Sequence, residues 1–305
     1  MHLPEEFTRR VVATFAPDGA PWLAALPGLI AACAARWDLA VGPPFPDLSY
    51  NYVAPATLPD GAPAVLKLGV PREELSTEID ALRHYAGRGA ARLLAADEAA
   101  GALLLERLAP GGTLAPLAAR DDEAATRVAA EVQARLWRPP PPGHRYPSVA
   151  DWAAGLSELR PRFGGGTGPF PARLVERAEA LFAWLLATQA DPVVLHGDLH
   201  HFNILDAGGG EWRAIDPKGV VGEPAYEAGA LLRNPIPDIS RRPRLAELLA
   251  RRIAVIAAIQ GLDPGRLRAW ALAQAVLSAW WSYEDGDPAP DLAVALALER
   301  LDGAG

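Results

Sequence analysis

The chain has 305 residues, half of them hydrophobic, which is enough for two domains or one two-lobed domain with a sizeable core. Its net charge of −8 and the lack of a basic stripe argue against a nucleic-acid partner and suit a small cationic one. Cys33 is the only cysteine, so an intramolecular disulfide is excluded and a cytoplasmic location is expected. Neither a signal peptide nor a membrane-spanning helix is expected.

The first third of the chain is predicted to form a small sheet with two helices. An apolar, alanine-rich helix is expected over residues 20–37. Strands over 49–53 and 64–69 are joined by turn-forming residues at 58–61, and a polar helix follows over 72–87. The last strands expected in this part form a hairpin, residues 91–95 and 102–106.

Beyond Gly112 the pattern becomes mainly helical. The expected helices cover residues 120–137, 149–159, 171–189 and most of 244–301, with a break near 285–290. Between them, a short strand over 193–195 and a strand over 212–215 flank a glycine turn at 208–210. These two strands bracket the most informative segment of the chain.

That segment, Leu195 to Asn203, reads Leu-His-Gly-Asp-Leu-His-His-Phe-Asn, and a second aspartate, Asp216, lies 18 positions after Asp198. A kinase catalytic loop needs this set of groups. Asp198 is the expected general base, which accepts the proton of an attacking hydroxyl. Asn203 and Asp216 are the expected Mg²⁺ ligands. His196 is expected to hold the loop backbone rather than to take part in chemistry.

The lysines add a second signal, because only two of the 29 basic residues are lysines, Lys67 and Lys218. Lys67 lies in the apolar run Ala64–Leu68, which matches the kinase strand whose lysine binds the α- and β-phosphates of ATP. That lysine needs a carboxylate partner. Glu78 on the following helix is the expected one, and Glu74, one turn earlier, is the competitor. Lys218 is left without an assigned role.

The end of the last strand of this part is the expected hinge for adenine binding. Glu106 and Leu108 lie there, and their backbone rather than their side chains would bond the base. One departure from the kinase pattern is that no Gly-x-Gly-x-x-Gly motif precedes Lys67. Backbone amides, or Ser49 and Asn51, are the candidates to cover the phosphates instead.

The element order and the catalytic set predict an α+β, protein-kinase-like fold of two lobes. A small β-rich lobe is expected over residues 1–107 and a larger helical lobe over 108–305. The segments 196–203 and Asp216-Pro217-Lys218-Gly219-Val220-Val221-Gly222 resemble the aminoglycoside phosphotransferases. The chain is most similar to the streptomycin 6-phosphotransferase branch, the aminoglycoside/hydroxyurea resistance kinases, over roughly residues 20–285. The resemblance implies Mg²⁺- and ATP-dependent phosphorylation of a streptomycin hydroxyl by the catalytic set.

Streptomycin carries guanidinium groups, which pair best with planar carboxylates. An acidic and aromatic wall for such a cation is expected from five residues, Glu227, Asp238, Trp281, Glu284 and Asp285. The competing interpretation is a core helix that ends in a solvated acidic turn. The six acids from Glu284 onward, against one arginine, are likewise expected to form a solvated tail.

Three other functions are compatible with parts of the sequence. A kinase of another small metabolite (hydroxyurea, a sugar or an amino alcohol) would keep the catalytic set and change only the substrate pocket. A metal hydrolase could use His196, Asp198, His200 and His201 as ligands. That function would leave Lys67, Asn203 and Asp216 unexplained. A nucleotide-binding regulator without catalysis is disfavoured by the intact catalytic set. The oligomeric state is left open.

Overall fold

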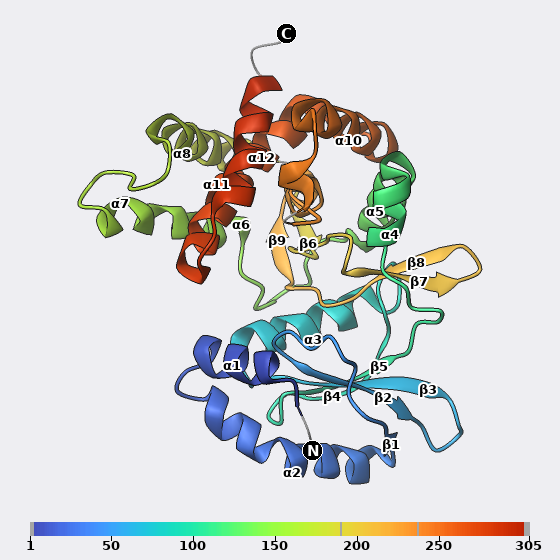
Figure 1. Cartoon of the computed structure of the whole chain (residues 1–305). Coiled ribbons are helices and arrows are strands. Elements are labelled where there is room, and N and C mark those ends of the chain that lie inside the picture. The colour runs from blue at the N-terminus through green and yellow to red at the C-terminus, as the bar shows by residue number, and fades with distance from the viewer. Residues whose placement is uncertain (1–2, 190, 237, 302–305) are drawn as a thin grey trace. The chain divides into compact units, whose positions relative to one another are not determined.

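The structure is a computed structural model that describes residues 3–189, 191–236 and 238–301. The chain divides into two compact units, a first that ends at Gly111 and a second that begins at Gly112. Figure 1 shows the helices and strands of both units, coloured along the chain.

The first unit is built on a five-stranded antiparallel sheet with the strand order β1-β2-β3-β5-β4. Its strands are β1 (Ala40–Val41), β2 (Tyr52–Thr57), β3 (Pro63–Leu68), β4 (Leu93–Asp97) and β5 (Ala102–Glu106). Lys67 lies opposite Val53 on one side and Leu103 on the other. Because side chains alternate along a strand, Lys67 and its neighbour Leu66 project from opposite faces of the sheet.

Helices cover both faces of this sheet (Figure 1). Helices α1 (Glu5–Thr14) and α2 (Gly19–Trp37) share a hydrophobic cluster with the face that carries Leu66. Helix α3 (Glu73–Tyr85) carries Glu78 to the face of Lys67. The order of helix and strands therefore agrees with the sequence pattern, except that α1 and the two-residue strand β1 were not predicted.

Helix α2 is the one described helix that is long and apolar enough to cross a membrane, judged by length and composition alone. Those two criteria do not distinguish a membrane span from a helix that packs on a sheet. Here Trp22, Leu26 and Cys33 are buried in the hydrophobic cluster of the first unit. Cys33 is a free thiol, and burial raises its pKa, so it behaves as a small core residue.

Two short antiparallel pairs form the β structure of the second unit. Strand β6 (Val193–Leu195) pairs with β9 (Val220–Gly222), and β7 (Ile204–Gly208) pairs with β8 (Glu211–Ala214). The predicted catalytic loop connects β6 to β7, and the segment of Asp216 connects β8 to β9. The pairing of β6 with β9 therefore brings the two predicted catalytic segments to the same end of the pair.

Helix α11 (Pro264–Asp285) is the central helix of the second unit, and every residue from Trp270 to Trp280 is buried. A helix that is buried on all sides needs partners all round, and four other helices supply them. These are α8 (Ala172–Ala187), α9 (Ala228–Leu232), α10 (Leu245–Gln260) and α12 (Ala289–Arg300). Helix α5 (Asp122–Leu136) packs on α10. The shorter helices are α4 (Ala115–Arg120), α6 (Val149–Ala154) and α7 (Leu159–Arg162), and the 3₁₀ turns are η1 (Gly155–Glu158), η2 (Pro224–Glu227) and η3 (Asp238–Arg241).

The acidic C-terminal segment is not uniformly solvated. Glu284 and Asp287 are exposed, but Asp291 is only 1% exposed, and its Oδ2 accepts a hydrogen bond from Ser282 Oγ at 2.8 Å. Asp302 lies outside the described residues. The expectation of a solvated tail is therefore wrong at Asp291, because α12 folds back along α11 and encloses that side chain.

Candidate active site

Backbone hydrogen bonds tie the predicted catalytic loop to the segment that carries Asp216. The N–H of Lys218 donates to the carbonyl of His196 at 2.8 Å, and the N–H of Ile215 donates to the carbonyl of Asn203 at 2.9 Å. These two bonds lie on either side of Asp198 and Asp216. The structure therefore brings together all three residues of the predicted set in the second unit.

His196 holds the loop from inside. Its ring is buried, with Nε2 2.8 Å from the carbonyl of Ile215 and Nδ1 accepting the N–H of Asp198 at 3.3 Å. These partners assign the proton to Nε2. Burial lowers the pKa of His196 to about 4, so the ring is neutral at physiological pH. The histidine thus has the structural role that the sequence predicts.

The amide group of Asn203 bridges the loop. Its Nδ2 donates to the carbonyl of Asp198 at 3.0 Å, which leaves the side-chain oxygen as the atom suited to a cation. Asp216 has a φ of 58°, in the left-handed region that residues other than glycine rarely adopt. Such backbone strain is concentrated at functional sites. The hydrogen bond of Asn203 and the strained backbone of Asp216 are therefore both typical of residues whose side chains must point in a fixed direction.

An amide oxygen and a carboxylate are the donors that Mg²⁺ uses when substrate phosphates complete its coordination. The pair Asn203 and Asp216 fits that cation. Among the described residues there is no group of three or more His, Cys, Asp or Glu side chains that could hold a metal ion. The ring of His196 is also fully committed to the loop backbone. The metal hydrolase interpretation therefore has no support in the described part of the chain.

Glu227 lies beneath the loop and is only 1% exposed. Its Oε2 accepts the N–H of His196 at 2.6 Å, and its Oε1 accepts the N–H of Gly197 at 3.0 Å. Burial raises the pKa of Glu227 to about 7, against the opposing effect of these backbone donors. A carboxylate enclosed in this way cannot pair with a substrate guanidinium. The substrate role predicted for Glu227 is therefore corrected to support of the catalytic loop.

The other residues of the predicted substrate wall have different environments. Trp281 is half-buried and packs edge-on against Trp152, with ring centroids 6.1 Å apart. Glu284 is exposed near the end of α11, and Asp238 is exposed at the start of η3. Asp285 ends α11, and its side chain lies outside the described part of the structure. Their contact with a substrate remains a prediction.

In the first unit, Lys67 and Glu78 form a buried ion pair. Lys67 Nζ donates to Glu78 Oε1 at 2.6 Å and to Oε2 at 2.8 Å, and the two side chains are 3% and 8% exposed. Glu74 is exposed. The carboxylate that contacts Lys67 is therefore that of Glu78, the partner expected from the sequence.

Glu106 is held by Arg92 through both its side chain and its backbone. Its carboxylate accepts the N–H and the Nε of Arg92, each at 2.8 Å, and its own N–H donates to the Arg92 carbonyl at 2.9 Å. These contacts fix the strand end where the hinge is predicted. Adenine recognition by the backbone of Glu106 and of the half-buried Leu108 remains a prediction.

Several residues around the loop were not predicted to be part of the kinase site. Gly197 has a φ of 85°, and a Cβ at this position would lie 2.7 Å from the indole of Trp152. Arg233 places Nη2 3.6 Å from Asp198 Oδ1, while His200 Nε2 lies 3.7 Å from Asp198 Oδ2. Nothing in the sequence near Arg233 indicates that it faces Asp198.

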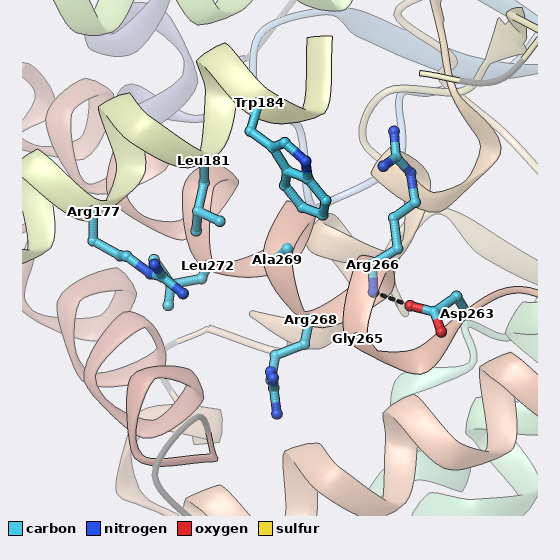
Figure 2. A pocket seen from close by; sticks show the side chains of 9 residues that line it. All are labelled: Arg177, Leu181, Trp184, Asp263, Gly265, Arg266, Arg268, Ala269 and Leu272. Carbon is cyan, nitrogen blue, oxygen red and sulfur yellow. Dashed lines mark hydrogen bonds between the residues drawn. The ribbon is translucent and has the colours of Figure 1, made fainter. Parts of the chain in front are cut away.

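A separate pocket lies between α8 and α11 (Figure 2). The guanidinium of Arg266 lies over the ring of Trp184, 5.4 Å from its centroid, and also pairs with Glu223. Asp263 accepts the N–H of Arg266 at 2.6 Å (Figure 2). None of the nine described residues that line this pocket belongs to the predicted site, and Arg266 links the two helices through its contact with Trp184.

The chain is similar to a known family and to curated proteins over most of its length. Residues 37–286 match the model of a family described as aminoglycoside/hydroxyurea antibiotic resistance kinase. Streptomycin 6-kinase of Streptomyces glaucescens is 34% identical over 99% of this chain and 98% of its own. Hydroxyurea phosphotransferase of Kitasatospora aureofaciens is 35% identical over 100% of this chain and 87% of its own.

A solved structure shows the same fold at low sequence identity. The aminoglycoside phosphotransferase APH(4)-Ia, in a ternary complex with ADP and hygromycin B, has a TM-score of 0.61 at 16% identity. The match covers 90% of this chain and 98% of that one. The α+β, two-lobed, protein-kinase-like fold expected from the sequence is therefore confirmed.

Proposed function

Because the chain belongs to the aminoglycoside/hydroxyurea antibiotic resistance kinase family, we propose that it transfers the γ-phosphoryl group of ATP to a hydroxyl of streptomycin. It is a phosphotransferase with an alcohol group as acceptor. The observation that carries the proposal is that backbone hydrogen bonds tie the loop of Asp198 and Asn203 to the segment of Asp216.

In the proposed reaction, Asp198 orients the substrate hydroxyl and accepts its proton as the oxygen attacks the γ-phosphorus. A bond forms between that oxygen and the phosphorus, the bond from phosphorus to the bridging oxygen breaks, and ADP leaves. Lys67, held by Glu78, binds the α- and β-phosphates. Asn203 and Asp216 would hold Mg²⁺, which neutralises charge on the phosphate oxygens when it is bound.

The substrate proposal rests on charge and on the relatives. The chain carries 37 acidic and 29 basic residues, which favours a cationic substrate. The exposed carboxylate of Glu284 and the half-buried ring of Trp281 lie three positions apart on α11, so they share one face of that helix. Such a face suits a guanidinium group. A cytoplasmic site of action is proposed on the same basis, since both nucleotide and reduced thiol belong there.

Phosphorylation of hydroxyurea is the second candidate. One observation favours it, since the hydroxyurea phosphotransferase relative is as similar to this chain as the streptomycin kinase relative is. The catalytic roles of Asp198, Asn203 and Asp216 are the same for either acceptor. Only the substrate contacts would differ.

The test is ADP release from Mg-ATP, measured with streptomycin, hydroxyurea, kanamycin and a set of sugars and amino alcohols. Asp198→Ala serves as the blank, with nucleotide binding measured in parallel. The proposal expects turnover with streptomycin that falls by at least about 10²-fold in the variant. Turnover with hydroxyurea alone would favour the second candidate, and a wild-type protein that binds no nucleotide would overturn both.

A further inference from the structure

Arg233 lies between two carboxylates in the second unit. Its Nη2 is 3.6 Å from Asp198 Oδ1, and its Nε is 3.6 Å from Asp291 Oδ1. A closed ion pair between guanidinium and carboxylate has a nitrogen–oxygen distance of about 2.7–2.9 Å. Arg233 forms such a close pair with neither Asp198 nor Asp291, so its guanidinium is shared between the two carboxylates.

The backbone that carries Arg233 is fixed independently of these acids. Arg252 donates to the carbonyls of Leu231 and Asn234, at 3.0 Å and 2.7 Å, and pairs with Asp122 at 2.6 Å. Arg252 is itself buried. The position of the Arg233 Cα is therefore set, and only the direction of its side chain depends on its partners.

Three groups set that direction. Ser278 on α11 accepts from Arg233 Nε at 3.0 Å, and the two acids lie on either side. Asp291 is held in turn, because its second oxygen accepts from Ser282, one turn beyond Ser278 on α11. Contacts thus connect Asp291 of α12, and Ser278 and Ser282 of α11, through Arg233 to the predicted base Asp198.

Two atoms in this arrangement are buried without a hydrogen bond to any described residue, Nη1 of Arg233 and Oδ1 of Asp291. Buried polar atoms without a hydrogen bond destabilise a protein and call for an explanation. A shift of the guanidinium toward Asp291 would satisfy that carboxylate but would remove the positive charge from Asp198. A shift toward Asp198 would occupy the oxygen that must accept the substrate proton.

We propose that Asp291 is a positioning residue for phosphoryl transfer, which holds Arg233 close enough to orient Asp198 but prevents it from closing on that carboxylate. The inference rests on the proposed function of Asp198 as the base. Asp291, a buried residue of α12 that is far from the catalytic loop in sequence, would thus affect the rate of phosphoryl transfer.

The first test is kinetic. In Asp291→Asn the side chain keeps its shape and loses its charge, so Arg233 is expected to close on Asp198 and to lower kcat by up to about 10²-fold. The KM for ATP should not change, because the nucleotide contacts are elsewhere. Ser282→Ala, which removes only the hydroxyl that holds Asp291, should lower kcat in the same direction and provides a milder variant.

A matched control lies on the same helix. Glu299 of α12 pairs with Arg173 at 2.7 Å and contacts none of the predicted catalytic residues. Glu299→Gln should leave kcat unchanged. An equal loss of kcat in Glu299→Gln and Asp291→Asn would mean that any weakening of α12 slows the enzyme, which would overturn the positioning role.

The second test needs no substrate. Urea unfolding of Asp198→Asn, Asp291→Asn and the double variant forms a double-mutant cycle. If Arg233 is shared, removing one acid strengthens its bond to the other, so the two effects should not add. The coupling should vanish when the cycle is repeated in Arg233→Met. Additive effects in the wild-type background would overturn the inference even if streptomycin proved not to be the substrate.

Discussion

The carboxylate of Glu227 accepts the backbone N–H of His196 at 2.6 Å, at the first position of the catalytic loop. Its other oxygen binds the next N–H, that of Gly197. A single buried side chain from η2 thus fixes the two residues that precede the predicted base. The acid that the sequence suggests for the substrate is instead part of the support of the loop.

Glu227→Gln tests the protonation of this group. The folded-state pKa is about 7, raised from an ordinary value of 4.5, so the folded protein holds the proton more tightly than the unfolded chain. The stabilisation is therefore complete below pH 4.5 and is lost as the pH rises to about 7. We expect the free energy of unfolding of the wild type, minus that of the variant, to fall by about 3 kcal/mol across this range.

Urea unfolding at closely spaced pH values measures this difference. His196 shifts in the opposite direction, with a folded-state pKa of about 4, and would partly mask the effect in the wild type alone. Because His196 is present in both proteins, the subtraction removes its contribution. Parallel stability curves for the two proteins would contradict the assignment.

Lys67→Ala is expected to lower both ATP use and stability. The ion pair with Glu78 is buried, and removing one partner of such a pair costs about 3–5 kcal/mol. Thermal unfolding and the KM for ATP are the two measurements.

The double variant Lys67→Met/Glu78→Leu separates the two effects. An apolar pair of similar volume should recover most of the lost stability, since buried ion pairs are often replaceable in this way. ATP use should not recover, because the phosphate contact is still missing. Recovery of activity together with stability would show that Lys67 is structural only.

Gly197→Ala should disable the loop. The backbone there has a φ of 85°, and the added methyl would lie 2.7 Å from the ring of Trp152. The expected result is a loss of turnover with nucleotide binding retained. Trimming the indole in Gly197→Ala/Trp152→Leu relieves the clash but not the backbone strain, so activity should return only in part. Full activity in the single variant would contradict the rigid geometry of the loop.

Glu284→Gln tests the predicted substrate wall. Because Glu284 is exposed, its loss should leave stability unchanged and raise the KM for a cationic substrate, most clearly at low salt. The KM for ATP is the internal control. Equal KM values for streptomycin in the variant and the wild type would remove Glu284 from the substrate site.

The parts of the site that could be predicted are those encoded by local spacing. Asp198 and Asn203 precede the hairpin of β7 and β8, and Asp216 follows it, so their distances along the chain determine how they meet. Lys67 and Glu78 are joined by one strand and one helix, and the spacing again identifies the pair. Short-range patterns of this kind do not need a tertiary structure to be recognised.

The remaining residues depend on contacts between distant segments. Glu227 and Arg233 meet the loop about 30 residues after it, and Asp291 reaches Arg233 only because α12 folds back along α11. No periodicity in the sequence marks an acid as buried when its partners lie on another helix. Helix α1 was not predicted because only two of its residues, Phe7 and Val11, are buried, which is too few for a clear helical pattern of apolar residues.

The most direct test of the central claim is mass spectrometry of streptomycin incubated with the protein and Mg-ATP. The predicted result is a product heavier by one phosphoryl group in the wild type and essentially none in Asp198→Ala, which still binds ATP. Unmodified streptomycin after incubation with a wild-type protein that binds ATP would contradict the proposed substrate. A phosphorylated product formed equally well by Asp198→Ala would contradict the proposed base.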